Sequence, residues 1–220
     1  MNTEKINLAK NAVELVKDGM IIGVGAGTTI DLFVQELIDY VNKNNLHIKF
    51  VSASSDLNQK ASVNGVTVLE VSNVSEIDLY FDGADFVNVD SKLVSKGNGG
   101  FIYNENYLVQ FASQSFLLID ESKLNFERLP KIFLEVKEDF IAEAFNVLAG
   151  YTFFVREELS ESGNLVIEVV LDNESFLARF VDFDLEHSCI LASGTSKNRY
   201  SNVWIARSGV SIIDKINLKS

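Results

Sequence analysis

The chain has 220 residues, of which 47% are hydrophobic and 23% charged. This length and composition allow one large domain or a main domain with a smaller insert. The formal net charge of -12 and the sequence pI of about 4.6 argue against nucleic acid or an anionic membrane as a partner. A phosphorylated ligand would be repelled as well, so a phosphate site would need backbone N–H groups and a few lysines.

Cysteine and histidine usage indicates neither a disulfide framework nor a metal site. The single cysteine, Cys189, cannot form a disulfide within the chain, which fits a reducing cytoplasm. His47 and His187 lie far apart and lack a ligand-like spacing, so we expect no metal. The polar residues 1–10 contain no signal core, and no apolar run reaches the ~20 residues of a membrane span. We therefore expect a cytoplasmic protein without a membrane partner.

The first 120 residues alternate between helical and strand patterns. Ile6, Ala9, Val13 and Val16 recur at helical spacing, and the helix that we expect over residues 30–41 could be capped by Thr28 or Thr29. Apolar runs predict strands over residues 20–25, 48–53, 66–71, 79–82 and 116–120, with a further helix over 107–113. This alternation predicts an α/β fold with a parallel sheet and helices on both of its faces.

The pattern changes at Pro130, the only proline. We predict a strand over residues 132–136, a helix over 140–148 and alternating strands over 151–157, 165–171 and 176–183. Alternating apolar and polar residues are typical of an antiparallel sheet with one solvated face. Residues 201–206 return to the apolar pattern. The sequence thus predicts a main domain over 1–130 plus 198–220 and a small α+β domain over 131–197.

The glycine-rich stretch from Gly23 to Thr29 lies between a predicted strand and a predicted helix. Glycine lets the backbone approach a ligand closely, and a helix N-terminus presents unpaired N–H groups to an anion. The stretch could therefore hold a phosphate, or it could simply be a tight turn with a threonine cap. It is no Walker A loop, because no lysine follows Gly27, and Thr28 breaks the GxGxxG spacing.

Two aspartates, Asp82 and Asp85, follow an apolar strand in the sequence DGAD. Ligands of open parallel sheets bind outside the carboxyl ends of the strands. We expect both side chains to be exposed there and close together. Such carboxylates could shuttle protons between sugar oxygens, bind a metal, or cap the next turn.

A third stretch, Lys96 to Gly100, is followed by Glu105 in a predicted helix. A lysine in a glycine-rich loop can stabilise a developing oxyanion, and Glu105 could remove a carbon-bound proton. Lys123 ends a fourth stretch, Asp120 to Lys123, after another apolar strand. Each residue taken alone could equally be an ordinary surface residue.

The four stretches in this order resemble the ribose-5-phosphate isomerase A family. The family carries a GxGST-like loop, DGADE, a KGGGAAL…EK stretch and D-x-SK, which stand here as GAGTT, DGADF, KGNGGFIYNEN and DESK, over roughly the first 125 residues. The resemblance implies a Rossmann-like parallel-sheet domain with an inserted ferredoxin-like lid, no cofactor or metal, and a homodimer or homotetramer. It also implies interconversion of ribose 5-phosphate and ribulose 5-phosphate in the pentose phosphate pathway.

The resemblance also implies roles for individual residues. Asp82 would assist ring opening, Glu105 would move a proton between C2 and C1 through an enediolate, and Lys96 would stabilise the enediolate charge. Asp85 is the fourth expected catalytic residue. The expected substrate-binding residues are Ala26, Gly27, Thr28, Thr29, Asp82, Gly83, Ala84, Asp85, Lys96, Gly97, Asn98, Gly99 and Lys123.

Several residues depart from the family pattern, namely Ala26, Phe86, Asn98, Asn104 and Asn106. Because the asparagines beside Glu105 replace positive charges, a sugar-phosphate sensor on the same fold is an alternative. A CoA transferase would need more chain to accommodate CoA, and a nicotinamide-dependent dehydrogenase would need the GxGxxG spacing. We favour a working isomerase because the charged residues of all four stretches are present.

Overall fold

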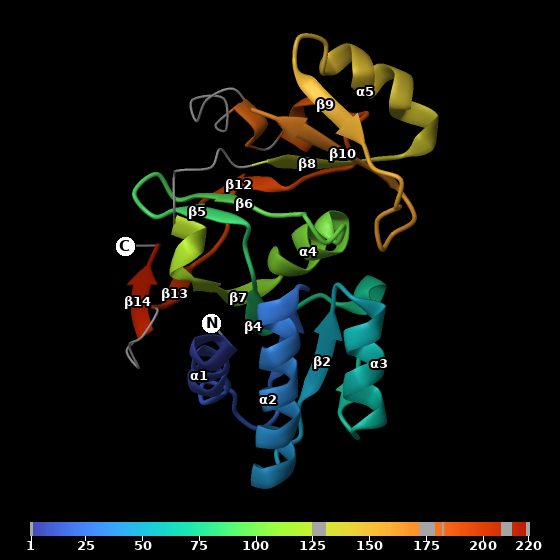
Figure 1. The fold of residues 1–220 in the computed structure, drawn as a ribbon. Coiled ribbons are helices and arrows are strands. Elements are labelled where there is room, and N and C mark those ends of the chain that lie inside the picture. The colour runs from blue at the N-terminus through green and yellow to red at the C-terminus, as the bar shows by residue number, and fades with distance from the viewer. Residues whose placement is uncertain (1, 125–130, 172–178, 182, 208–212, 219–220) are drawn as a thin grey trace. The chain divides into compact units, whose positions relative to one another are not determined.

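The computed structural model describes residues 2–124, 131–171, 179–181, 183–207 and 213–218 (Figure 1). The chain divides into two compact units. The first comprises Met1–Gly83, Tyr107–Ser122 and Arg199–Ser220, and the second comprises Ala84–Asn106 and Lys123–Asn198. The division differs from the predicted domains, because residues 84–106 group with the second unit. Pro130, where the sequence pattern changes, lies outside the described residues.

The first unit is built on a mostly parallel sheet. Within the described residues its strand order is β14-β13-β7-β4-β1-β2-β3. All neighbouring strands are parallel except β13 and β14, which are antiparallel. The strands are β1 (Ile21–Val24), β2 (Lys49–Ser52), β3 (Thr67–Val68), β4 (Ile77–Asp82), β7 (Ala112–Asp120), β13 (Asn202–Ala206) and β14 (Ile213–Asn217). The predicted parallel sheet is thus confirmed, and β1 and β4 lie side by side within it.

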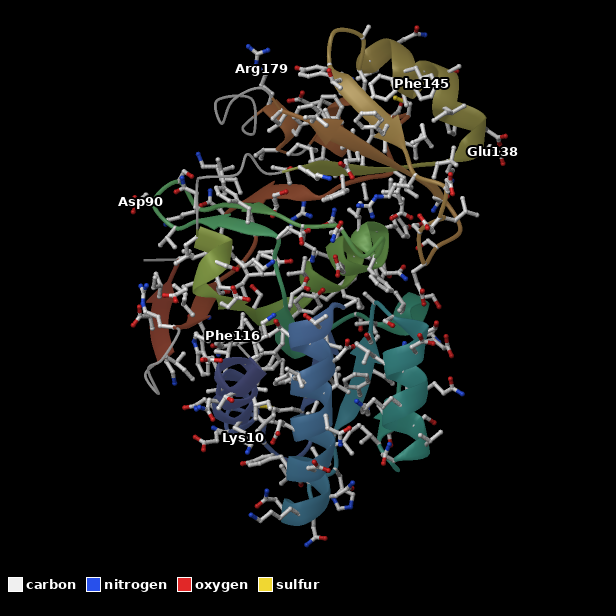
Figure 2. All side chains as sticks on the ribbon, in the orientation of Figure 1. Lys10, Asp90, Phe116, Glu138, Phe145 and Arg179 are labelled. Carbon is white, nitrogen blue, oxygen red and sulfur yellow. The ribbon has the colours of Figure 1, made fainter. Side chains whose placement is uncertain are left out.

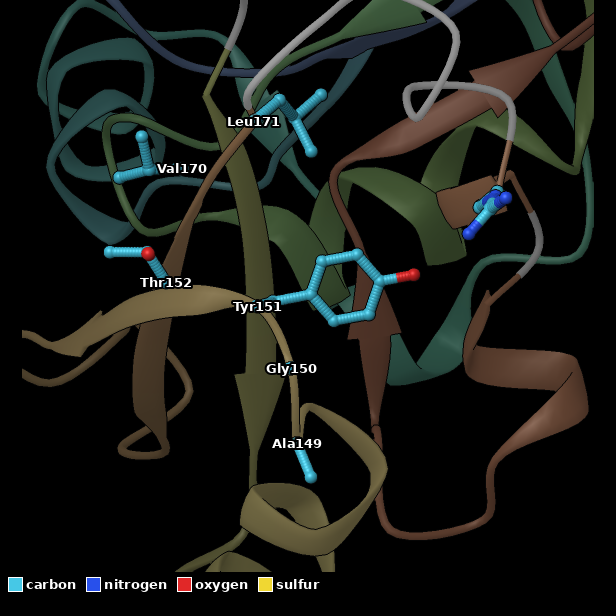
Figure 3. A pocket seen from close by; sticks show the side chains of 7 residues that line it. Ala149, Gly150, Tyr151, Thr152, Val170 and Leu171 are labelled. Carbon is cyan, nitrogen blue, oxygen red and sulfur yellow. The ribbon is translucent and has the colours of Figure 1, made fainter.

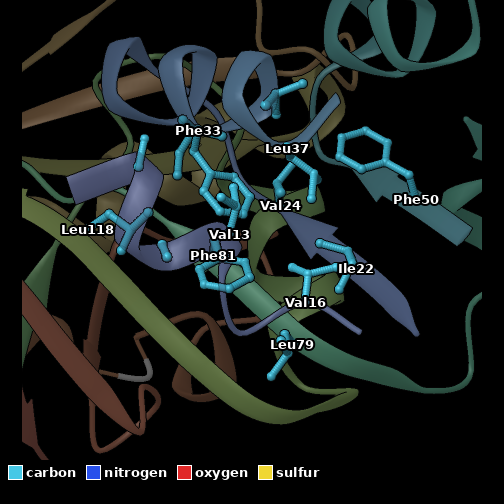
Figure 4. Packing of buried hydrophobic residues seen from close by; sticks show 14 of the residues in the cluster. Val13, Val16, Ile22, Val24, Phe33, Leu37, Phe50, Leu79, Phe81 and Leu118 are labelled. Atoms are coloured by element: carbon cyan, nitrogen blue, oxygen red, sulfur yellow. The ribbon is translucent and has the colours of Figure 1, made fainter. Parts of the chain in front are cut away.

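Apolar side chains from both helices and strands form the core of this unit (Figure 4). The helices are α1 (Asn2–Val13), α2 (Thr28–Asn44), α3 (Ser55–Val63) and the 3₁₀ turn η1 (Val71–Asn73). Phe33 of α2 packs on Phe81 of β4 with ring centroids 4.3 Å apart, and Phe81 stacks on Phe116 of β7 at 5.2 Å. Each such buried side chain contributes about 1.5–3 kcal/mol through removal from water. This packing fixes the strand ends from which the polar loops emerge.

The second unit contains two smaller sheets. One is antiparallel with the order β11-β8-β10-β9, and the other has the order β12-β6-β5. The strands are β5 (Phe86–Asn88), β6 (Leu93–Ser95), β8 (Ile132–Val136), β9 (Thr152–Val155), β10 (Leu165–Val170), β11 (Ala192–Ser193) and β12 (Thr195–Lys197). Because β6 pairs with β12, residues 84–106 group with this unit.

Helical segments of the remaining chain are short. They are α4 (Ile102–Val109), η2 (Glu121–Leu124), η3 (Glu138–Phe140), α5 (Ile141–Val147) and α6 (Phe183–Glu186). The division between the units falls within α4. The separate antiparallel sheets agree with the predicted α+β character of this part of the chain.

Three predicted elements were wrong, wholly or in part, in the described residues. The strand expected over 66–71 forms only at Thr67–Val68, and Val71 already begins the 3₁₀ turn η1. The helix expected over 107–113 is α4, which ends at Val109, because Ala112 already pairs with Ile77 as the first residue of β7. The strand expected over 176–183 is not formed at residues 179–181 and 183; residues 172–178 and 182 lie outside the described residues. The ring centroids of Phe180 and Phe183 instead lie 4.8 Å apart. Residues three apart share a face of a helix, whereas in a strand residues two apart share a face.

Most charged side chains lie at the surface, whereas aromatic residues occur both in the core and at the surface, where Phe145 is 41% exposed (Figure 2). Lys10, Asp90, Glu138 and Arg179 are exposed, whereas Phe116 is buried. Among the described residues, no helix combines the length and the apolar character that crossing a membrane would require.

Candidate functional site

The glycine-rich loop of the first unit joins β1 to α2. Gly27 is the N-cap residue with φ of 106°, and α2 begins at Thr28. In the described residues no side chain caps this end of α2, so the expectation that Thr28 or Thr29 would do so was wrong. Gly27 and Thr28 are exposed, and Ala26 is half-buried. The start of a 17-residue helix thus carries a partial positive charge without a side-chain cap, which suits an anion.

Asp82 ends β4 and is buried, with 1% of its surface exposed. Its Oδ2 accepts hydrogen bonds from the hydroxyls of Tyr80 (3.1 Å) and Tyr200 (2.9 Å), and its Oδ1 accepts one from the Gly83 N–H (2.8 Å). These donors compensate the loss of hydration of the carboxylate. The expectation of an exposed Asp82 was therefore wrong, because two tyrosines cover it.

Asp85 belongs to the second unit and is exposed. Its Oδ2 accepts the Asn98 N–H at 3.1 Å, which ties this aspartate to the loop after β6. Surrounding protein atoms nevertheless reduce its hydration, and this desolvation raises the pKa of Asp85. The Asn98 hydrogen bond and then the charges of Lys123, Lys96 and Arg156 act in the opposite direction. Asp85 therefore lies in a locally positive environment within an acidic protein.

Lys96 and Glu105 form a buried ion pair. Lys96 Nζ lies 2.9 Å from Glu105 Oε2, and the two residues are only 4% and 5% exposed. Lys96 is held at the end of β6 by its N–H, which donates to the Gly194 carbonyl at 2.9 Å. The Glu105 N–H donates to the Phe101 carbonyl at 3.0 Å in the first turn of α4. Two charged residues predicted from the third stretch, Lys96 and Glu105, are thus in direct contact.

Two glycines, Gly97 and Gly194, allow the backbone around Lys96 to pack closely against neighbouring segments. Gly97 has φ of +115°, and a Cβ there would lie 2.8 Å from both Ile102 and Phe133. A Cβ on Gly194 would lie 2.1 Å from the Lys96 carbonyl oxygen. Both positions consequently exclude larger residues.

Asn98, which interrupts the family's glycine triplet, is bound by Arg156. Arg156 Nη1 donates to the Asn98 carbonyl at 2.6 Å and Nη2 donates to Asn98 Oδ1 at 2.8 Å. The guanidinium also lies 4.5 Å from the Phe133 ring centroid, in a cation–π contact. The substitution at position 98 therefore adds a fixed contact to the loop.

The other departures in this unit also have structural partners. Asn106 Nδ2 donates to the Ser193 carbonyl at 2.9 Å, and the Ser162 hydroxyl donates to Asn104 Oδ1 at 3.3 Å. Phe86 is 4% exposed and packs in the apolar core of the second unit. These three residues thus contribute contacts to the second unit, and Glu105 itself is present.

Sequence reasoning missed two charged residues in this region, Arg156 and Glu135. Glu135 interrupts the apolar run from Ile132 to Val136, a pattern that indicates a buried acid with partners. Arg156 follows an alternating strand among acidic neighbours, and nothing in its sequence context pointed to Asn98.

The described residues include no group of three His, Cys, Asp or Glu that could hold a metal ion. A pocket of about 260 Å³ lies elsewhere in the second unit (Figure 3). It is lined by Ala149, Gly150, Tyr151, Thr152, Val170, Leu171 and Arg179. No predicted site residue lines this pocket.

The predicted site residues therefore fall into two sets. The first unit holds the loop from Ala26 to Thr29 together with Asp82 and Gly83. The second unit holds Ala84, Asp85, Lys96, Gly97, Asn98, Gly99, Glu105 and Lys123. Within the second set, hydrogen bonds and charges link Asp85, Lys96, Asn98, Glu105 and Lys123.

Known proteins of one family are similar to this chain. Residues 49–206 match the family described as ribose 5-phosphate isomerase A (phosphoriboisomerase A). A ribose-5-phosphate isomerase A of Legionella pneumophila (strain Lens) is 30% identical over 175 residues, covering 77% of this chain and 78% of that protein. The one of Staphylococcus haemolyticus (strain JCSC1435) is 27% identical and covers 97% of both chains.

A solved structure shows the same fold. Ribose 5-phosphate isomerase A from Methanocaldococcus jannaschii superposes with a TM-score of 0.88 at 24% identity, covering 98% of this chain and 99% of that one. Fold and relatives together define the chain as a sugar-phosphate isomerase. More particularly, it belongs to the ribose 5-phosphate isomerase A family. The predicted family, fold class and enzyme class are confirmed.

Proposed function

We propose that the chain interconverts ribose 5-phosphate and ribulose 5-phosphate, with Glu105 as the base. The observation that carries this proposal is the buried Lys96–Glu105 pair at 2.9 Å. A carboxylate and an ammonium in contact provide a proton acceptor beside a stabiliser of negative charge. An aldose–ketose isomerisation needs both, because removal of the C2 proton places negative charge on the sugar oxygens.

The reaction neither gains nor loses a proton overall, because each proton removed from the sugar is returned to it. Glu105 takes the proton from C2 of the open-chain aldose, and the electron pair forms an enediolate stabilised by Lys96. The same carboxyl then returns the proton to C1, while a hydroxyl proton moves between the two oxygens. Lys96 and Glu105 are shielded from bulk water, so water competes little with the sugar for contact with this pair.

We assign the phosphate group to the loop from Ala26 to Thr29. The exposed start of α2 and the hydroxyls of Thr28 and Thr29 supply donors in an otherwise acidic protein. Ring opening by Asp82 remains a prediction. It requires a sugar hydroxyl to reach the Asp82 carboxylate beside Tyr80 and Tyr200, which both donate to Oδ2.

The experiment is an isomerase assay of the wild type and of Glu105→Gln. Loss of the base should lower kcat by roughly 10²–10⁴-fold, the usual contribution of general acid–base catalysis. Glu138→Gln, which changes an exposed glutamate of η3, serves as the matched control and should retain activity. Equal turnover in the wild type and Glu105→Gln would remove Glu105 from the mechanism. A wild type that binds ribose 5-phosphate without turnover would instead favour the sensor.

A further inference from the structure

The side chain of Glu135 is a buried carboxylate that the proposed mechanism does not use. The residue lies in β8 and is 0% exposed. Its Oε2 accepts the Tyr103 N–H at 2.9 Å, and its Oε1 accepts the Ser160 hydroxyl at 2.6 Å and the Asn164 side-chain amide at 2.9 Å. Burial of an acid is costly, so a fully satisfied acid inside an apolar strand needs a reason.

The partner Tyr103 is the second residue of α4, the helix that carries Glu105. The first N–H groups of a helix have no acceptor within the helix. The Glu105 N–H donates to the carbonyl of Phe101, the residue before the helix, at 3.0 Å. Glu135 therefore acts as a distant cap, 32 residues away in sequence, and its negative charge also favours the positive end of the helix.

The helix depends on such external contacts. It has eight residues, and isolated helices shorter than about 12–15 residues are marginal in water. The turn that supplies the two other Glu135 partners contacts the same segment twice more. The Glu161 N–H donates to the Gly100 carbonyl at 2.9 Å, and the Ser162 hydroxyl donates to Asn104 Oδ1 at 3.3 Å.

We propose that Glu135 is a positioning residue for the reaction: it fixes the start of α4 and thereby holds the Glu105 carboxylate against Lys96. The Ser160 and Asn164 donors hold the Glu135 carboxylate in turn, so that the turn between β9 and β10 and the helix share one buried acceptor. This inference rests on the proposed role of Glu105 as the base. A displacement of about 1 Å in such a group is enough to lower a rate by about 10²-fold.

The central variant is Glu135→Met, which keeps the approximate side-chain volume and removes the acceptor. We expect kcat to fall by about 10- to 100-fold while KM changes by less than about threefold, because the carboxylate holds the base rather than the substrate. Glu135→Gln should recover kcat to within about fivefold of the wild type. Its oxygen can face the Tyr103 N–H while its amide faces Ser160 and a flipped Asn164, both of which can accept.

The control for general destabilisation is Val136→Ala. Val136 is the next residue of β8, is 0% exposed and packs in the apolar core of the second unit. This variant should lower the melting temperature without lowering kcat. If Glu135→Met does not fold, Ser160→Ala carries the test, since it removes one of the donors that hold the carboxylate. It should lower kcat by about threefold and speed amide hydrogen exchange in residues 102–109 relative to Val136→Ala.

The outcomes separate this inference from the proposed function. Equal turnover in the wild type and Glu105→Gln would overturn the proposed role of Glu105, on which this inference rests. If Glu105→Gln is inactive while Glu135→Met keeps its kcat, or changes only KM, Glu135 has no positioning role. A loss of kcat in Val136→Ala equal to that in Glu135→Met, or an unchanged kcat and exchange rate in Ser160→Ala, would also overturn the inference.

Discussion

Gly25 lies directly against Asp82, since a Cβ on Gly25 would fall 2.0 Å from Asp82 Oδ1. The carboxylate cannot easily move away, because Tyr80, Tyr200 and Gly83 all donate to it. Gly25→Ala should therefore destabilise the protein by about 1–3 kcal/mol, the usual cost of overpacking. For a chain of this size, each kcal/mol corresponds to about 2–4 °C in melting temperature.

The control for Gly25→Ala is Gly83, whose N–H donates to the same carboxylate. A Cβ on Gly83 would meet the Ala26 carbonyl oxygen at 3.9 Å, an ordinary contact. Gly83→Ala should thus melt close to the wild type. Equal melting temperatures for the two variants would contradict the claim that Gly25 is needed for space.

Tyr200 donates to Asp82 across 118 residues of sequence. Tyr200→Phe removes this donor and keeps the buried ring. A hydrogen bond to a charged group contributes about 1.5–3 kcal/mol, so we expect a loss of that size in the free energy of unfolding, measured with urea. Tyr103→Phe removes a hydroxyl from a residue that is 39% exposed and should be nearly neutral. A larger loss in Tyr103→Phe than in Tyr200→Phe would refute this account of Asp82.

The buried Lys96–Glu105 pair predicts strong coupling between the two residues. Lys96→Met leaves the Glu105 carboxylate without its cation and should destabilise the protein by about 3–5 kcal/mol. The double variant Lys96→Met with Glu105→Leu removes both charges and should be more stable than Lys96→Met alone. A double-mutant cycle of unfolding free energies measures this coupling. Strictly additive effects would show that the two side chains do not depend on each other.

Local pattern in the sequence was sufficient to predict the parallel strands and the charged residues that follow them. Apolar runs such as Ile132–Val136 correspond to strands, and Lys96 and Glu105 were both singled out from one glycine-rich motif. The short strands β5, β6 and β12 were missed because three residues carry no measurable period. Their pairing, which places residues 84–106 in the second unit, depends on contacts distant in sequence.

Burial of individual acids could not be predicted either. Asp82 and Asp85 stand three residues apart in one motif, yet one is 1% exposed and the other is classed as exposed. One of the two tyrosines that cover Asp82 is Tyr200, whose hydroxyl reaches it across 118 residues of sequence. The role of Glu135 likewise depends on Tyr103 and Asn164, which lie 32 and 29 residues away. Such partners become visible only when the chain is folded.

The raised pKa of Asp85 predicts a pH dependence of stability. Desolvation places the folded-state pKa above the unfolded value of 3.8, so the folded protein binds this proton more tightly than the unfolded chain. The contribution of Asp85 to stability therefore falls as pH rises from 3.8 through the folded-state pKa. Below pH 3.8 the carboxyl is neutral in both states and resembles an asparagine.

Asp85→Asn should consequently match the wild type most closely near pH 3.5 and gain stability relative to it toward pH 7. The asparagine oxygen can still accept the Asn98 N–H, so the hydrogen bond to the loop is kept. Urea unfolding of both proteins across this pH range measures the difference. Asp90→Asn, an exposed acid of the same segment, corrects for the loss of one surface charge. A difference that shrinks or reverses toward pH 7 would mean that the neighbouring charges of Lys123, Lys96 and Arg156 outweigh desolvation.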